Sequence, residues 1–261
     1  MGIVNVTPDS FSDGGDNVDP TVAIETALRF LDEGAALVDI GGESTRPGAA
    51  AVTLDEELRR VVPVLEGLVG HPVSIDTSKA EVARRALALG ARLVNDVTAL
   101  RGDPALAGVV ADAGAHVCLM HMQGQPRTMQ VAPRYDDVVE EVCAFLEERL
   151  AVAVAAGIPE ERMCLDPGIG FGKTVEQNLA LLRGLDRVCR IGPPVLVGVS
   201  RKSTLARVLG DPEGRVGSDA ASIGAAVAAF DRGATLFRVH DVRAHVDALA
   251  IAAAIEGGDG Q

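Results

Sequence analysis

Short runs of apolar, often β-branched residues alternate along the chain with longer segments in which apolar residues recur every three or four positions. The short runs are typical of buried β-strands, and the longer segments are typical of amphipathic helices. Regular alternation of the two predicts repeated βα units around a parallel sheet. We count eight such units along the chain.

The predicted strands are short and regularly spaced. They span residues 2–6, 37–40, 73–76, 93–96, 116–120, 163–166, 195–199 and 236–239. Helical periodicity is clearest at 22–33, 55–69, 81–89, 136–156, 218–232 and 242–255. The loops after strands 1, 2, 5 and 6 are long and rich in Gly, Pro, Asp and Thr, whereas the connections into strands are short. Barrel enzymes place their chemistry on the longer βα loops.

The length of 261 residues fits one eight-stranded α/β barrel, which typically takes about 250 residues. An open, doubly wound sheet is the alternative architecture. It usually carries a Gly-x-Gly-x-x-Gly turn after its first strand, and this chain has none. We therefore predict a single-domain (β/α)8 TIM barrel over residues 1–256, followed by a disordered tail at 257–261.

The net charge limits the partners that the protein can bind, and the cysteines indicate its cellular compartment. The formal net charge is −13 and the sequence pI about 4.8, so a diffuse basic surface for nucleic acid or an anionic membrane is excluded. The four cysteines form no Cys-x-x-Cys pair, which favours reduced thiols in the cytosol. The N-terminus lacks a secretory pattern, and no run of about eighteen apolar residues occurs. We expect a soluble, cytoplasmic protein.

Polar residues stand at or just past the end of nearly every predicted strand. They are Asn5, Asp39, Asp76, Asn95, Asp96, His121, Asp166, Lys202, Arg238 and His240. Any one of them could simply cap the following helix. In a closed barrel, however, all would converge at the mouth formed by the carboxyl ends of the strands, where barrel enzymes have their active sites.

The chemistry of these side chains suggests a flat, phosphorylated ligand. Asp76, Asn95 and Asp166 can read the 2-amino-4-oxo edge of a heterocycle such as a pterin. Lys202, Arg46 and Arg238 supply local positive charge in an acidic protein. Two of these cations follow the last two strands, where barrels usually bind phosphate.

Three loops add further candidates. In NVTPDSFSDGG, Asn5 and Asp13 could offer oxygens to Mg²⁺, although the loop holds few carboxylates. The segment DPGIGFGK at 166–173 lacks the spacing of a nucleotide-binding phosphate loop, so its glycines more plausibly let Phe171 approach a flat ring. The segment SRKS at 200–203 puts a hydroxyl at a helix start that can receive a carboxylate. The last two loops therefore indicate a binding site for an aromatic acid.

Eight ordered motifs resemble those of the bacterial dihydropteroate synthase family of folate biosynthesis. They are NVTPDSFSDGG, DIGGESTRPGA, SIDTSKA, LVNDV, HMQGQPRTMQ, DPGIGFGKT, GVSRKS and RVHDV, and they span residues 2–242 in order. The resemblance implies a transferase that joins p-aminobenzoate to 6-hydroxymethyl-7,8-dihydropterin diphosphate, releasing diphosphate and 7,8-dihydropteroate. It also implies Mg²⁺ and a homodimer. Members of this family usually carry a short additional segment before the first strand.

The resemblance assigns roles to individual positions. The implied pterin site is Asp76, Asn95, Met120, Asp166 and Lys202, and the implied diphosphate site is Thr45, Arg46, Arg238 and His240. The implied p-aminobenzoate site is Phe11, Thr45, Pro47, Phe171, Lys202 and Ser203. Asn5 and Asp13 would hold Mg²⁺. Asp76, Asp166, Lys202, Asp13 and Arg46 are the implied catalytic residues, with Asp9 a weaker candidate beside Asp13.

Three alternative functions stay open at this point. A pterin-dependent methyltransferase would share the Asp and Asn pocket but would need no p-aminobenzoate site, so the segments STRPG and SRKS favour the synthase. A catalytically silent paralogue would bind a pterin or a partner protein. A Schiff-base aldolase using Lys202 would leave the diphosphate-binding residues without a purpose.

Overall fold

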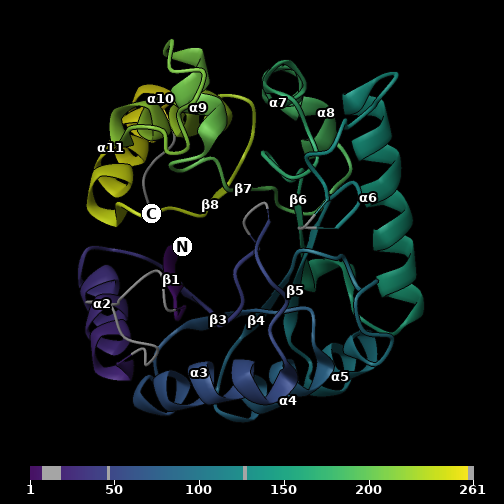
Figure 1. The fold of residues 1–261 in the computed structure, drawn as a ribbon, viewed down its shortest axis with the longest axis vertical. Helices are drawn as coiled ribbons and strands as arrows, with labels where there is room; N and C mark the ends of the chain where they lie inside the picture. The colour runs from purple at the N-terminus through teal and green to yellow at the C-terminus, as the bar shows by residue number, and fades with distance from the viewer. Residues whose placement is uncertain (8–18, 46–47, 126–127, 258–261) are drawn as a thin grey trace.

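Eight parallel strands form a ring with helices packed around its outside (Figure 1). The computed structural model describes residues 1–7, 19–45, 48–125 and 128–257. The strands are β1 (Gly2–Asn5), β2 (Val38–Gly41), β3 (Val73–Asp76), β4 (Leu93–Asp96), β5 (His116–Met120), β6 (Met163–Asp166), β7 (Leu196–Val197) and β8 (Leu236–Phe237). β1 to β6 pair in chain order in one sheet, and β7 pairs with β8.

Two isolated bridges close the ring. Val195 pairs with Leu165 of β6, and Val239 pairs with Gly2 of β1. The backbone bonds Leu165 N to Pro194 O (2.9 Å) and Ile3 N to Val239 O (3.0 Å) support these contacts. The predicted barrel is therefore confirmed. The last two strands are shorter than the predicted 195–199 and 236–239, because Val195 and Val239 belong to isolated bridges and not to a continuous ladder.

The helices form the outer layer of the barrel (Figure 1). They are α2 (Pro20–Asp32), α3 (Leu54–Gly67), α4 (Ala80–Ala88), α5 (Leu106–Ala113), α6 (Val138–Ala155), α7 (Val175–Arg183), α8 (Leu185–Cys189), α9 (Ser203–Val208), α10 (Asp219–Phe230) and α11 (Val242–Ile255), with a 3-10 turn η1 (Glu160–Arg162) before β6. Six of them begin at a side chain that accepts a bond from the first helical turn. These caps are Asp19, Thr53, Asp137, Thr174, Ser218 and Asp241.

The observed caps show which of the polar residues at the strand ends cap a helix and which can form a site at the mouth of the barrel. Asp76, Asn95 and Asp166 are not among these caps, so their side chains serve another purpose. Asp96 is different, because its carboxylate accepts bonds from the backbone N–H groups of Thr98 (2.8 Å) and Leu100 (2.6 Å). Asp96 therefore stabilises its own turn.

The alternation of side chains along each strand separates the core from the site. Residues such as Val4, Ile40, Ile75 and Val94 are fully buried in the main hydrophobic core, which also contains the buried faces of the helices. Successive side chains of a strand point to opposite faces. Asp39, Asp76, Asn95 and Asp166, which alternate with these apolar residues, therefore lie on the inner side of the ring.

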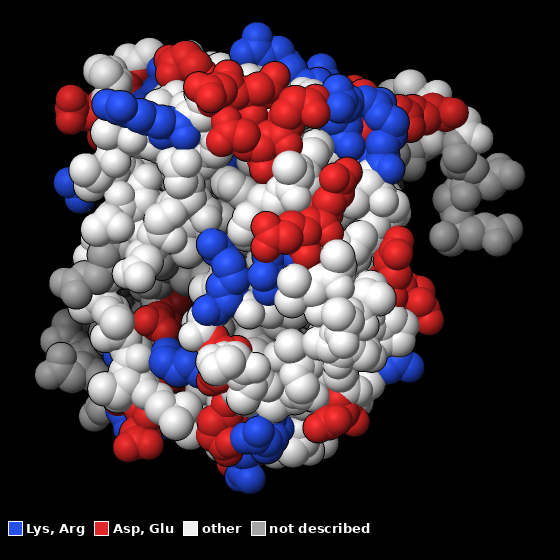
Figure 2. Space-filling view, turned by 90° about the vertical axis from the view of Figure 1, so that its right-hand side faces the viewer, with Lys and Arg blue, Asp and Glu red and all other residues white. Residues whose placement is uncertain are grey.

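Figure 2 shows one side of the outer surface. That side is covered by α6, and acidic and basic side chains both lie on it, around a broad uncharged area. Arg187 of α8 forms an ion pair with Glu140 of α6 there (2.7 Å). Among the described residues, no helix is long and apolar enough to cross a membrane. All four cysteines are free thiols. Residues 258–261 lie outside the described residues, so the disordered tail stays a prediction.

Candidate active site

A charged cluster at the mouth of the barrel is centred on Arg238, which follows β8. Its guanidinium donates through Nε to Asp39 Oδ2 (2.6 Å) and through Nη2 to Asp76 Oδ2 (2.8 Å). Asn95 Nδ2 donates to the same oxygen of Asp39 (3.0 Å). The cluster therefore joins β2, β3, β4 and the end of β8. Asp39 is fully buried and is the member that the predicted site residues omit.

Burial shifts the protonation of this cluster. It raises the pKa of Asp76 to about 7, against the opposing charge of Arg238. Asp39 Oδ1 is buried and has no hydrogen-bond partner among the described residues. A buried polar atom of this kind is costly. The cluster therefore holds a carboxyl that titrates near neutral pH and an acceptor that remains unused.

The second half of the site lies at the end of β6. Asp166 Oδ1 accepts a bond from Gly168 N (2.7 Å), and burial raises the pKa of Asp166, with Lys202 opposing that shift. Lys202 Nζ donates to Ile169 O and lies 4.1 Å from the centroid of the Phe171 ring. Burial lowers the pKa of Lys202 to about 8, and the charge of Asp166 opposes this. Asp166, Lys202 and Phe171 therefore lie near one another at the mouth.

Met120 supplies an apolar wall beside Asp166. It is 3% exposed and pairs with Asp166 in the register of β5 and β6. It packs in a small cluster with Val97, Met122 and Met129, against which Phe171 also lies. The methionines are flexible and polarisable, which suits contact with a flat ring.

The remaining described candidates sit around this centre. Ser200 Oγ lies 3.0 Å from His240 Nδ1 and accepts a bond from His240 N (3.2 Å), which links the ends of β7 and β8. Ser203 begins α9 directly after Lys202, and both are half-buried. Asn5 ends β1, and Thr45 lies in the loop after β2, both half-buried.

Five other candidates fall on residues that the structure does not describe. They are Asp9, Phe11, Asp13, Arg46 and Pro47. Their predicted roles at the metal, the diphosphate and the p-aminobenzoate site stay predictions.

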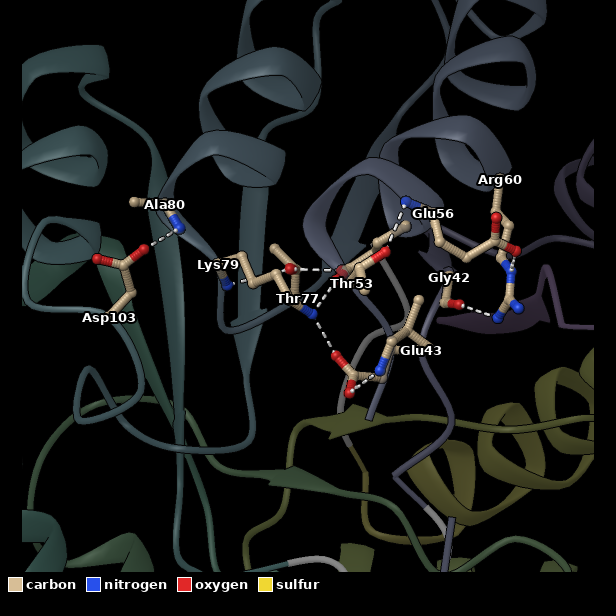
Figure 3. Close-up of polar contacts among 11 residues, drawn as sticks. Gly42, Glu43, Thr53, Glu56, Arg60, Thr77, Lys79, Ala80 and Asp103 are labelled. Atoms are coloured by element: carbon tan, nitrogen blue, oxygen red, sulfur yellow. Dashed lines mark hydrogen bonds and ion pairs between the residues drawn. The ribbon is translucent and has the colours of Figure 1, made fainter. Parts of the chain in front are cut away.

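The base of the loop after β2 is held by a network that Figure 3 shows. Glu43 accepts bonds from Val52 N (3.1 Å) and from Lys79 Nζ (2.5 Å). Lys79 also donates to Glu57 of α3, which is fully buried and accepts a second bond from Thr77 Oγ1 (2.6 Å). The loop that carries Thr45 is therefore tied at its start to Lys79, in the segment between β3 and α4, and through it to α3.

Sequence reasoning missed a buried pair behind the β6 loop. Lys173 Nζ lies 2.9 Å from His121 Nδ1, and both residues are buried. The signal was present, because Lys173 ends the glycine-rich segment DPGIGFGK. The sequence shows that this segment is no nucleotide-binding loop, but it does not indicate where the lysine points.

The described residues contain no group of three or more His, Cys, Asp or Glu side chains placed to hold a metal ion. Asn5 offers a single amide oxygen at the mouth. One hard oxygen ligand suits Mg²⁺, which usually keeps several waters and shares substrate phosphates.

The closed parallel ring and the charged groups at the carboxyl ends of its strands define a (β/α)8-barrel enzyme. Residues 1–240 match the model of the family described as pterin binding enzyme. The chain is 46% identical over 255 residues to dihydropteroate synthase of Escherichia coli K12, covering 96% of this chain and 89% of that protein.

Solved structures are similar over nearly the whole fold. Dihydropteroate synthase of Xanthomonas albilineans with 4-aminobenzoic acid superposes with a TM-score of 0.89 at 52% identity, covering 98% of this chain and 92% of that one. The enzyme of Yersinia pestis in a sulfonamide drug complex has a TM-score of 0.90 at 46% identity, covering 98% and 94%. The chain therefore belongs to the pterin-binding enzyme family, within its dihydropteroate synthases, and is a transferase.

Proposed function

We propose that this chain joins p-aminobenzoate to 6-hydroxymethyl-7,8-dihydropterin diphosphate, forming 7,8-dihydropteroate and releasing diphosphate. The observation that carries the proposal is the convergence of Asp76, Asn95, Asp166 and Lys202 on one mouth, beside the half-buried ring of Phe171. The relative from Xanthomonas albilineans, whose structure contains 4-aminobenzoic acid, supports the choice of the second substrate.

The pterin would lie among the buried polar groups of β3, β4 and β6. Asp166 and Asn95 offer acceptors and donors for the amino and oxo edge of the ring, and Lys202 can donate to a ring nitrogen or oxygen. Met120 would support the ring face. Asp39 would act through Asn95 and Arg238, because its bonds orient both side chains.

The reaction exchanges one bond for another at the pterin methylene carbon. The carbon–oxygen bond breaks and the diphosphate leaves with its electron pair. The amine nitrogen of p-aminobenzoate forms the new carbon–nitrogen bond and loses a proton. Asp76 and Asp166, when ionised, stabilise the positive charge that develops on the methylene and ring. Enclosure of the site keeps out water, which would otherwise compete with the amine.

The aromatic acid would lie between several loops. Phe171 and the amine of Lys202 form one described wall, and Ser203 lies at the start of α9 where a carboxylate can be received. Thr45 would contribute from the loop after β2. Phe11 and Pro47 complete this proposed site.

Diphosphate would be bound by Thr45, Arg46, Arg238 and His240. Arg238 has five N–H donors, and its bonds to Asp39 and Asp76 use two of them, so it can hold carboxylates and an anion together. Asn5 and Asp13 would hold Mg²⁺ with the diphosphate oxygens. The ion would neutralise charge on the leaving group.

The oligomeric state, the cellular compartment and the partners of the protein are also part of the proposal. We propose a homodimer in the cytoplasm that acts on small-molecule substrates and binds neither nucleic acid nor membrane. The net charge of −13 supports the last two points.

A product assay tests the proposed function. Purified protein is incubated with both substrates, with and without Mg²⁺, and pteroate formation is measured, with each substrate omitted in turn as a control. We expect product only with both substrates and much more with Mg²⁺. Absence of product under every condition would overturn the proposal, and tight binding of methyltetrahydrofolate would favour the methyltransferase instead.

A further inference from the structure

A buried lysine that the proposed reaction does not use lies behind the substrate mouth. Lys173 is 3% exposed, and its ammonium group reaches three acceptors. These are Gly168 O (2.9 Å), Phe171 O (3.0 Å) and His121 Nδ1 (2.9 Å). The protonated form of the lysine has three N–H donors, so the three contacts satisfy that form completely.

The partner histidine is suited to accept. Burial, together with the charge of Lys173, lowers the pKa of His121 to about 3, so its ring is neutral at physiological pH. A neutral imidazole keeps one nitrogen as an acceptor. Burial lowers the pKa of Lys173 to about 7, and the charge of Asp166 opposes this. Burying a cation costs folding free energy, and the contacts of Lys173 offset part of that cost.

The segment that Lys173 contacts is held at every carbonyl from 168 to 172. Lys173 binds two of them, and Lys202 binds Ile169 O. Gln130 Nε2 donates to Gly170 O (2.8 Å), and Tyr135 OH donates to Gly172 O (2.9 Å).

Backbone conformation explains why the segment needs these donors. Gly168, Gly170 and Gly172 have φ angles of +69°, +82° and +64°, which only glycine adopts readily. The chain folds back tightly here, because a Cβ added to Gly168 would lie 1.8 Å from His121 O. Three flexible glycines leave many conformations open, and the side-chain donors select one of them.

We propose that Lys173 is a positioning residue that, with the other carbonyl donors, fixes the β6–α7 loop so that the Phe171 ring faces the Lys202 amine. By this means it sets the affinity for p-aminobenzoate. The inference rests on the proposed function for its effect on substrate, but the placement of Phe171 can be measured independently of activity.

The absence of tryptophan from the chain allows a direct probe. A Phe171→Trp variant places one fluorophore at the position of interest. Adding Lys173→Met removes all three donors while keeping a long stem. We expect acrylamide quenching of the tryptophan to rise about twofold and its anisotropy to fall, because the loop loses its selected conformation.

Kinetics are measured in the chain that keeps Phe171. For Lys173→Met we expect the KM for p-aminobenzoate to rise about tenfold, with kcat changed less than about threefold. Arg149→Met is the matched control, because Arg149 is also buried and donates through Nε to a backbone carbonyl outside the β6–α7 loop, Ala99 O (2.8 Å). This control should lose stability but keep the wild-type KM.

The outcomes distinguish failure of the proposed function from failure of the inference about Lys173. No product from the wild type overturns the proposed function and leaves the fluorescence result standing. Equal quenching with and without Lys173→Met, or equal KM changes in Lys173→Met and Arg149→Met, overturns the inference. If Lys173→Met does not fold, Tyr135→Phe decides, because it removes one hydroxyl bond to the same loop. Unchanged quenching and unchanged KM in that variant also overturn the inference.

Discussion

At the residue scale, Asp76 is a carboxyl group that burial pushes toward its neutral form and Arg238 pulls toward its charged form. The balance raises its pKa to about 7. Only the ionised form stabilises a cationic transition state, so the fraction of useful enzyme should increase as pH rises through 7. Lys202, whose burial lowers its pKa to about 8, loses its charge slightly above that. We therefore expect activity to rise as Asp76 ionises and to fall as Lys202 loses its proton.

We predict that Asp76→Asn keeps the fold, lowers kcat by about 100-fold and changes the KM for p-aminobenzoate by much less. The reason is that the charge matters most in the transition state. The acid limb of the kcat profile near pH 7 should disappear with the charge. A pH profile of both proteins checks this, and equal changes in kcat and KM would argue against the role.

The same pKa predicts a pH dependence of stability. The Asp76 carboxyl has an ordinary value of 3.8 and a folded value of about 7, so between these values the unfolded chain ionises it and the folded chain does not. Its contribution to stability is complete below pH ~4 and is lost as pH rises through about 7. The wild type should lose up to a few kcal/mol relative to Asp76→Asn over this range. Urea unfolding at several pH values measures the difference, and parallel curves would refute the prediction.

Arg238 supports the site by satisfying two buried carboxylates. Asp39 is fully buried and Asp76 is 7% exposed. Arg238→Ala leaves both without their cation, which should cost about 3–5 kcal/mol of folding free energy. The variant should also weaken inhibition by free diphosphate. Thermal unfolding tests the first effect and inhibition by diphosphate tests the second, with Arg238→Lys as the charge-preserving control. Unchanged inhibition in Arg238→Ala would show that Arg238 is not part of the diphosphate site.

At the scale of elements, the periodicity of the sequence predicted where the strands begin and end, but it did not predict which side chains from different strands contact one another. β3, β4, β5 and β6 have the predicted bounds, because each is buried along its length except at the first residue of β4 and of β5. The joining of Asp39 to Arg238 could not be predicted in the same way, since it depends on closure of the ring across 199 residues of sequence. Lys173 also escaped prediction, because its direction is set by three positive φ angles.

Another element-scale contact ties the loop after β2 to α3 (Figure 3). Lys79 neutralises Glu57, which is fully buried, and Glu43, which is about a quarter exposed. We predict that Lys79→Met costs about 3–5 kcal/mol, because Glu57 stays buried without a cation. Glu43→Gln should cost less than about 1 kcal/mol, since water can replace that exposed partner.

Chemical unfolding of these variants tests that prediction. The double variant Lys79→Met with Glu57→Leu should recover much of the lost stability, because it removes the buried charge as well as its partner. A single Lys79→Met variant as stable as Glu43→Gln would show that Glu57 does not depend on the lysine.

At the scale of the whole molecule, the proposed p-aminobenzoate site draws on loops from four different strands. Phe11 follows β1, Thr45 and Pro47 follow β2, Phe171 follows β6, and Lys202 with Ser203 follows β7. Of these, Phe171 and Lys202 are in contact in the structure. The loop of Phe11 is rich in Gly, Ser and Asp.

We predict that sulfonamides, which imitate p-aminobenzoate, bind appreciably only when diphosphate and Mg²⁺ are already present. Diphosphate with Mg²⁺ would contact Asn5 and Asp13 on one loop and Arg46 on the next, and so draw Phe11 and Pro47 over the mouth. The slot against Phe171 is then complete, and the pterin substrate must bind before the aromatic acid. Calorimetry of one sulfonamide with the apo protein, with diphosphate alone and with diphosphate plus Mg²⁺ tests this order. We expect the affinity to rise at least about 100-fold with both ligands, and equal affinity in all three states would mean that the slot is preformed.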